Sequence, residues 1–249
     1  MDSIETNQAE QLSLSKAIAL HLLPGVVITA IFILLSTIMR SSGVPPLLWM
    51  VLAVPLGLIP TELGYLLYLG KQRNGRYSLD GLLAYQNTLT WKQYLWMVPA
   101  TFLGMLVLFT LAGAFDLVIF EQLFGWWPSW MNLELIDFAQ LSQSMLIIVV
   151  VGTMIFANLI GPAIEELYFR GYLLPRLARF GRWGNLLNTS LFALYHFWTP
   201  WHVIQRAIGS LPLAIAAKRG NLNIAIITHV LVNTIGFTLT VLGSLAAAQ

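Results

Sequence analysis

The sequence contains no cysteine and few charged residues. The absence of cysteine among its 249 residues excludes disulfides, thiolate metal ligands and a cysteine nucleophile. Charged residues make up 10% of the chain, whereas soluble globular domains carry about 25%. The net charge of +2 is small, so the composition gives no reason to expect a nucleic-acid partner.

Long apolar runs take the place of the missing charge. Hydrophobic residues make up 57% of the chain, and the mean hydropathy is +0.74. A membrane-spanning helix needs about 20 apolar residues. Runs near that length cover residues 17–39, 46–70, 94–120, 144–170 and 222–246. Two shorter and more polar runs, 185–200 and 203–217, can also span if they line a protein interior.

These runs predict an all-α, polytopic membrane bundle of about seven spans around a polar cavity that faces the cytosol. No internal repeat or second domain is visible, so residues 1–249 are expected to form a single integral membrane domain. The polar residues described below concentrate in a motif-bearing core, residues 144–246. The second span contains Pro55 and Pro60, which predict a kink.

The distribution of positive charge predicts the orientation. With a cytoplasmic N-terminus and seven spans, nearly all lysines and arginines fall inside, and only Arg40 and Arg206 lie outside or near the outer side. The 121–143 connection has no lysine or arginine and carries tryptophans typical of an outer interface. The start of the chain lacks the basic region of a secretory signal, which predicts that the first run is retained as a span. We therefore expect a multi-pass cell-membrane protein with a cytoplasmic N-terminus.

The segment between the second and third spans is predicted to be helical. Residues 77–93 place leucines at helical spacing after Ser78, a candidate N-cap. This pattern predicts a helix that lies on the inner membrane surface.

Two adjacent carboxylates stand inside the fourth apolar run, in the stretch GPAIEELYFRG. Glu165 and Glu166 lie about 100° apart on a helix, so they cannot point at the same partner. Arg170 is four residues after Glu166 and shares its face. The pattern therefore predicts a Glu166–Arg170 pair and leaves Glu165 free for other contacts. A purely structural salt-bridge cluster is the alternative interpretation.

Two histidines and an asparagine occupy later apolar runs. His196 follows Phe192 by four residues, and Asn233 follows His229 by four on one face of the last span. Each alone is most simply a hydrogen-bonded structural residue. Together with Glu165 they favour a shared cavity, because polar groups in a membrane must find each other or water.

Other polar residues carry less weight. Glu62, in the second span, is expected to make a local hydrogen bond rather than to line the cavity. His21 and His202 are expected at the interfaces. Asp116 and Arg206 have no evident catalytic partner.

The set Glu165, His196, His229 and Asn233 suits attack of water on an amide. A poorly solvated carboxylate is a plausible general base, a neighbouring histidine can orient the water, and a histidine with an asparagine can donate to an oxyanion. The zinc motif His-Glu-x-x-His is absent. Glu165, His196 and His229 could still ligate zinc, so a metal-dependent mechanism stays open, although no cofactor is favoured.

In these residues the sequence resembles the CPBP (CAAX protease and bacteriocin-processing) family. The resemblance rests on Glu165-Glu166-x-x-x-Arg170, Phe192-x-x-x-His196 and His229-x-x-x-Asn233, in this order, and covers roughly residues 145–240.

The resemblance implies an intramembrane endopeptidase. Glu165 would then activate water with His196, and His229 with Asn233 would form the oxyanion hole. Glu166, Arg170 and Phe192 would support them. The expected partners are a peptide or protein substrate at the membrane and the lipid bilayer. The substrate class does not carry over, because prokaryotic members of the family act on unrelated peptides. Two alternatives come from other classes: a non-catalytic immunity protein that binds a peptide or toxin, and a transporter.

Overall fold

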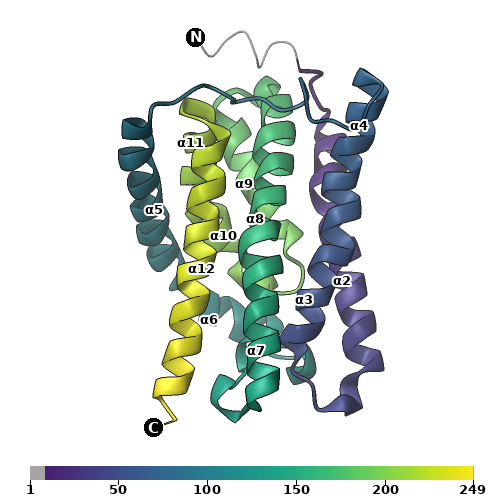
Figure 1. Cartoon of the computed structure of the whole chain (residues 1–249), viewed down its shortest axis with the longest axis vertical. Coiled ribbons are helices and arrows are strands. Elements are labelled where there is room, and N and C mark those ends of the chain that lie inside the picture. The colour runs from purple at the N-terminus through teal and green to yellow at the C-terminus, as the bar shows by residue number, and fades with distance from the viewer. Residues whose placement is uncertain (1–8, 249) are drawn as a thin grey trace.

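The computed structural model describes residues 9–248, so the first eight residues of the polar N-terminal stretch lie outside the described residues. Within the described range the regular secondary structure is helical (Figure 1). The α-helices are α2 (Leu14–Ile38), α3 (Pro46–Leu58), α4 (Tyr65–Asn74), α5 (Trp91–Gly113), α6 (Asp116–Ile119), α7 (Gln143–Gly152), α8 (Gly161–Glu165), α9 (Gly184–Tyr195), α10 (Val203–Gly209), α11 (Leu211–Arg219) and α12 (Leu222–Ala246).

Several of these helices are joined without a break by π-helical or 3-10 segments. The segment η2 (Ile59–Gly64) connects α3 to α4, and η7 (Thr153–Ile160) connects α7 to α8. Beyond α8 the chain continues as π-helical η8 (Glu166–Leu173) and 3-10 η9 (Leu174–Trp183). Pro60 lies in the first turn of η2, where its missing N–H disturbs the α-helical ladder. The kink predicted from proline is thus accompanied by a change of helix type.

Within residues 9–248, five helical stretches are long and apolar enough to cross a membrane. They are Leu14–Ile38, Pro46–Asn74, Trp91–Gly113, Gln143–Tyr195 and Leu222–Ala246. They correspond to the five strong runs of the sequence, so the predicted all-α membrane architecture is confirmed at this level.

The two weak runs do not form separate helices of that length. The run 185–200 becomes α9, the last part of the Gln143–Tyr195 stretch. Gly181, with φ of 56° and ψ of −130°, interrupts this stretch, and glycine tolerates that left-handed geometry. The run 203–217 divides at Ser210 into the short helices α10 and α11. Seven spans therefore remain a prediction, as does the opening of a cavity toward the cytosol.

The predicted surface helix over 77–93 is wrong in its first part. Residues 83–90 form no regular secondary structure, and α5 begins only at Trp91. This irregular segment bonds to neighbouring helical elements: the Ala84 N–H donates to the Gly171 carbonyl, and the Leu222 N–H donates to the Tyr85 carbonyl. These long-range bonds replace the intrahelical bonds that the leucine spacing favoured.

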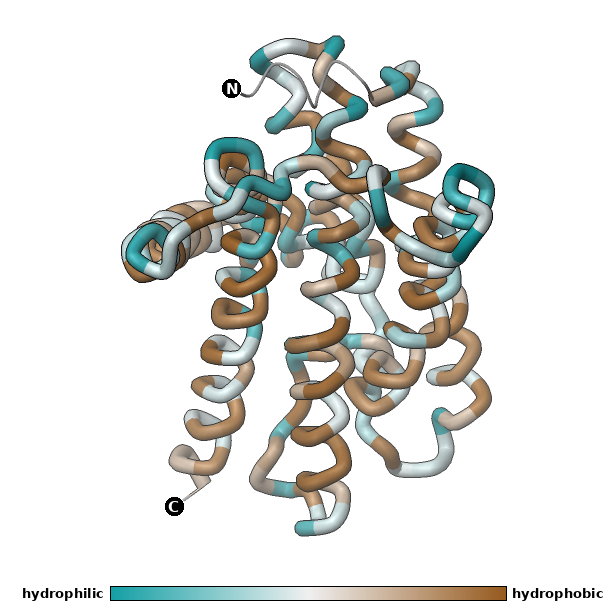
Figure 2. Tube along the Cα trace, turned by 45° about the horizontal axis from the view of Figure 1, so that its top comes forward, coloured by the Kyte–Doolittle hydropathy of each residue, from teal (hydrophilic) through white to brown (hydrophobic). Residues whose placement is uncertain are grey.

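The outer surface of the bundle suits a lipid environment. Large apolar side chains of α5 are exposed, among them Leu95, Leu103, Leu106 and Leu111. Figure 2 shows hydrophobic residues along the helices and hydrophilic ones concentrated at the turns. Since lipid tails are apolar, such exposure costs little in a membrane.

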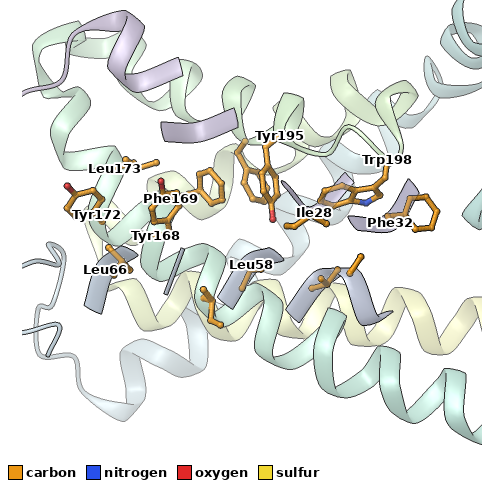
Figure 3. Close-up of a cluster of buried hydrophobic side chains, with 14 of the residues drawn as sticks. Ile28, Phe32, Leu58, Leu66, Tyr168, Phe169, Tyr172, Leu173, Tyr195 and Trp198 are labelled. Carbon is orange, nitrogen blue, oxygen red and sulfur yellow. The ribbon is translucent and has the colours of Figure 1, made fainter. Parts of the chain in front are cut away.

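The buried core packs α2, α3 and η8 against α9. It contains Ile28 and Phe32 from α2, Leu58 from α3, and Tyr168 and Phe169 from η8. Figure 3 shows Tyr195 and Trp198 within this cluster. The core therefore holds the end of α9, and with it the position of His196.

Candidate active site

The four residues predicted to do chemistry line one cavity of about 380 Å³. Glu165 ends α8, His196 follows the last residue of α9, and His229 and Asn233 lie on α12. Leu47, Leu133 and His202 also line the cavity. The structure thus brings together side chains up to 68 positions apart, and it supports a shared polar cavity.

Glu165 makes two polar contacts in the cavity wall. Its side chain is 8% exposed. The Tyr195 hydroxyl donates a hydrogen bond to Glu165 Oε1 at 3.1 Å, and His229 Nε2 lies 3.9 Å from Oε2. The carboxylate is therefore oriented by a hydroxyl on one oxygen and still faces the cavity.

Glu166 turns away from Glu165 and pairs with Arg170, as the sequence predicts. Arg170 Nη1 lies 3.1 Å from Glu166 Oε1, and both side chains are fully buried. The guanidinium carbon also lies 4.0 Å from the centre of the Phe192 ring, a cation–π contact. Phe192 thus supports the site by stacking on the arginine.

Glu166 has a second partner that the sequence did not predict. His229 Nδ1 lies 2.8 Å from Glu166 Oε1, and because the carboxylate accepts, Nδ1–H donates to it. The chain Arg170–Glu166–His229 therefore fixes the ring and leaves His229 Nε2 directed toward Glu165. Glu166 therefore pairs with Arg170 and also orients His229, a residue that lines the cavity.

His196 is held where α9 ends. Its Nδ1–H donates to the Phe192 carbonyl at 2.8 Å, which leaves Nε2 free as the second ring nitrogen. Arg206 stabilises the turn that follows His196. It donates hydrogen bonds to the carbonyl of Thr199 at 2.9 Å and to the hydroxyl of Thr199 at 2.8 Å. Arg206 thus has a structural role next to the site.

Asn233 faces the cavity one turn after His229. Its side-chain amide donates only a long bond, 3.4 Å, to the Ala157 carbonyl. The amide is therefore held loosely and retains donor capacity toward the cavity.

Sequence reasoning missed Tyr195 and misjudged two other polar residues. A tyrosine hydroxyl inside a membrane helix needs a partner, which was the available signal for Tyr195. Glu62 makes no local hydrogen bond, since neither of its oxygens has a hydrogen-bond partner among the described residues. His21 is not interfacial: it is fully buried, and Asn188 Nδ2 donates to its Nε2 at 3.0 Å.

A second polar cluster joins the 121–143 connection to the turn after His196. His202 Nδ1 lies 2.6 Å from Asp116 Oδ2, and His202 Nε2 contacts Glu134 Oε1. The indole of Trp201 donates to the same Glu134 oxygen at 3.1 Å. Burial opposes ionisation of Glu134, but the bond and charge of His202, the Trp201 bond and the charge of Arg206 outweigh it and hold the pKa of Glu134 below its ordinary value.

The site residues do not form a ready metal-ligand set. Among the described residues, no group of three or more histidine, cysteine, aspartate or glutamate side chains has an arrangement that could hold a metal ion. Nδ1 of both His196 and His229 is already engaged in hydrogen bonds.

The fold and site define a helical membrane protein with a buried Glu/His/Asn cavity. Residues 145–235 match the family described as type II CAAX prenyl endopeptidase Rce1-like, a protease family within the CPBP group. The resemblance read from the three motifs is thereby confirmed for this segment, which contains every proposed site residue. No curated protein and no solved structure matches the chain. The helices that are long and apolar enough to span a membrane, together with this similarity of residues 145–235 to a protease family, support a multi-pass membrane protein.

Proposed function

We propose that this protein is an intramembrane endopeptidase that hydrolyses a peptide bond with water activated by Glu165. The convergence of Glu165, His196, His229 and Asn233 on one cavity supports the proposal. The endopeptidase family matched by residues 145–235 supports it independently.

In the proposed reaction Glu165 takes a proton from water while the water oxygen attacks the scissile carbonyl carbon. His196 accepts a hydrogen bond from that water through Nε2. The oxyanion formed on the carbonyl oxygen receives hydrogen bonds from the Asn233 amide and from His229, whose Nε2 donates when the ring carries both protons. The C–N bond then breaks, and Glu165 passes its proton to the leaving amine.

The mechanism proposed here uses no metal. A nitrogen that donates to an oxyanion cannot also ligate zinc, and the His229–Asn233 pair suits two donors on one oxygen. Activity of protein purified without metal, with elemental analysis and a chelator series, tests this point. Stoichiometric zinc together with chelator inhibition that zinc reverses would overturn it and make Glu165, His196 and His229 the candidate ligands.

We place the N-terminus and the cavity opening on the cytosolic side, with seven spans, and the substrate as a peptide or protein at the membrane. Comparative peptidomics of cells with the wild-type protein or Glu165→Gln identifies candidate substrates. Purified protein in lipid vesicles is then tested on them, and on the same peptides with and without a C-terminal prenyl group. Glu121→Gln, at an exposed carboxylate, is the matched control. Wild-type binding without any cleavage would favour the immunity-protein alternative.

A further inference from the structure

Glu62 is a buried carboxyl group that the proposed mechanism leaves unused. It lies in the π-helical segment η2, which contacts α8, the helix that ends at Glu165. Its side chain is fully buried, and neither oxygen has a hydrogen-bond partner among the described residues. A buried carboxylate without a partner costs several kcal/mol, so this residue needs a physical reason.

The charged and titratable groups around Glu62 converge from three other elements. Glu165, Tyr168 and Arg170 face it from α8 and η8, and Tyr195 faces it from the end of α9. Arg170 is already paired with Glu166 at 3.1 Å. The Tyr168 hydroxyl donates to the Leu20 carbonyl at 2.8 Å. The charge of Arg170 is therefore shared with Glu166, and a neutral tyrosine has no charge with which to neutralise an ionised Glu62.

Tyr195 connects the two carboxyl groups. Its hydroxyl lies within electrostatic range of both Glu62 and Glu165, but a phenol has a single proton to donate, and that proton goes to Glu165 Oε1 at 3.1 Å. Glu62 can then form a hydrogen bond with Tyr195 only by donating a proton to the phenol oxygen. A protonated carboxylic acid can do this, whereas a carboxylate cannot.

The charge of Glu165 acts on Glu62, and two like charges that interact in a poorly solvated site do not both ionise. Glu165 is 8% exposed and lines the cavity, whereas Glu62 is fully buried behind it. The more buried group is the one that keeps the proton.

We infer that Glu62 is a positioning residue, a carboxylic acid that donates to Tyr195 and so fixes the tyrosine hydroxyl as the donor that orients the Glu165 carboxylate. Its effect on catalysis rests on the proposed function, since it acts through the assigned base. The hydrogen-bond order is Glu62 to Tyr195 to Glu165.

Three substitutions at two positions test the inference by kinetics. Glu62→Gln keeps a neutral donor, so turnover should fall by less than about 10-fold and the acid limb of the pH–rate profile should stay in place. Glu62→Leu removes the donor, so kcat should fall roughly 10- to 100-fold with KM little changed, and the acid limb should move to higher pH. Tyr195→Phe should reproduce Glu62→Leu, and the double variant should be no worse than either single one. An acid limb that moves to lower pH in Glu62→Gln would show that Glu62 is charged and would overturn the inference.

Infrared spectroscopy tests the protonation without using activity. The wild-type protein at neutral pH should show the carbonyl band of a buried protonated carboxylic acid, sensitive to exchange into D₂O. This band should be lost in Glu62→Gln and retained in Glu121→Gln. An unchanged band in Glu62→Gln would overturn the inference even if the peptidase is active, while a lost band in a protein that cleaves nothing would count against the proposed function alone.

Discussion

At the scale of single residues, Asn233 offers the most specific test of the proposed chemistry. Its amide makes one long bond of 3.4 Å in the resting structure, so its contribution should come in the transition state. Asn233→Ala should lower kcat roughly 100- to 1000-fold, the usual cost of losing an oxyanion donor, with little change in KM. Asn223→Ala, on the same helix but outside the cavity, should be near wild type. A pure KM effect would place Asn233 in substrate binding instead.

The Arg170–Glu166–His229 chain predicts strong coupling between buried charges. Arg170→Ala or Glu166→Ala should each cost about 3–5 kcal/mol of unfolding free energy, because each leaves an unpaired buried charge. The double variant should cost much less than the sum of the two. Thermal and denaturant unfolding in detergent measures this. The exposed Arg76–Asp80 pair has the same spacing and should show no measurable coupling; equal coupling in both pairs would contradict the prediction.

The site residues could be predicted because of their chemical type, but their partners could not. Paired carboxylates, histidines and an asparagine in apolar runs are conspicuous, and four-residue spacing predicts the Glu166–Arg170 pair. The contact of His229 with Glu166 depends on how α12 packs against η8, which local spacing does not specify. Tyr195 was overlooked because a tyrosine in an apolar run is chemically unremarkable until its neighbour is known.

At the scale of elements, the packing of α2 against the end of α9 fixes the positions of Tyr195 and His196. A Cβ atom added at Gly25 would lie 2.0 Å from the Tyr195 carbonyl oxygen, so the two helices would have to separate. Gly25→Ala should destabilise the protein by about 1–3 kcal/mol and lower activity by displacing Tyr195 and His196. Gly236→Ala, where nothing lies within 4 Å, should be neutral or slightly stabilising. Melting temperature and turnover measured together on both variants check this, and equal behaviour of the two would refute it.

The cluster of His202, Asp116 and Glu134 predicts an acid-sensitive attachment of the 121–143 connection. The pKa of Glu134 is lowered in the folded protein, so its stabilising contribution is present above the ordinary glutamate pKa of about 4.3 and is lost as the pH falls below that value. Glu134→Gln should therefore flatten the fall in melting temperature with acidification. Glu121→Gln should keep the wild-type slope, and an unchanged slope in Glu134→Gln would contradict the assignment.

Elements with strong local signals were predicted, and those determined by tertiary contacts were not. The five long apolar runs became helices because burial and backbone satisfaction in a membrane both favour them. Residues 83–90 continue a segment with helical leucine spacing, yet their backbone bonds to Gly171 and Leu222 instead of forming a helix. The weak run 185–200 formed a short helix because α9 is separated from the preceding helix at Gly181 and ends at Tyr195, and the run 203–217 is broken at Ser210.

At the scale of the whole molecule, the arrangement of the ends predicts sidedness. The end of α4, the start of α5 and the junction of α11 with α12 lie at one end of the bundle, and the start of α7 lies at the other (Figure 1). The first end is rich in lysine and arginine, so it should be cytosolic. Because the chain has no cysteine, single cysteines can be introduced at Trp130 and Phe180. An impermeant thiol reagent should reach position 130 from outside and position 180 only from inside; the reverse would refute the orientation and the cytosolic side of the cavity.

The π-helical segments on either side of α8 have a consequence for the evolution of this protein. Because η7 and η8 hold an extra residue per turn relative to an α-helix, loss of one codon within η7 could relax it to an α-helix. The rest of the helix would then keep its rotation about the axis, so Glu165 would still face the cavity, whereas loss of a codon from the α-helical residues 143–152 would turn Glu165 by about 100° away from it. Functional descendants of this chain are therefore expected to tolerate the loss of one residue within 153–160 but not within 143–152.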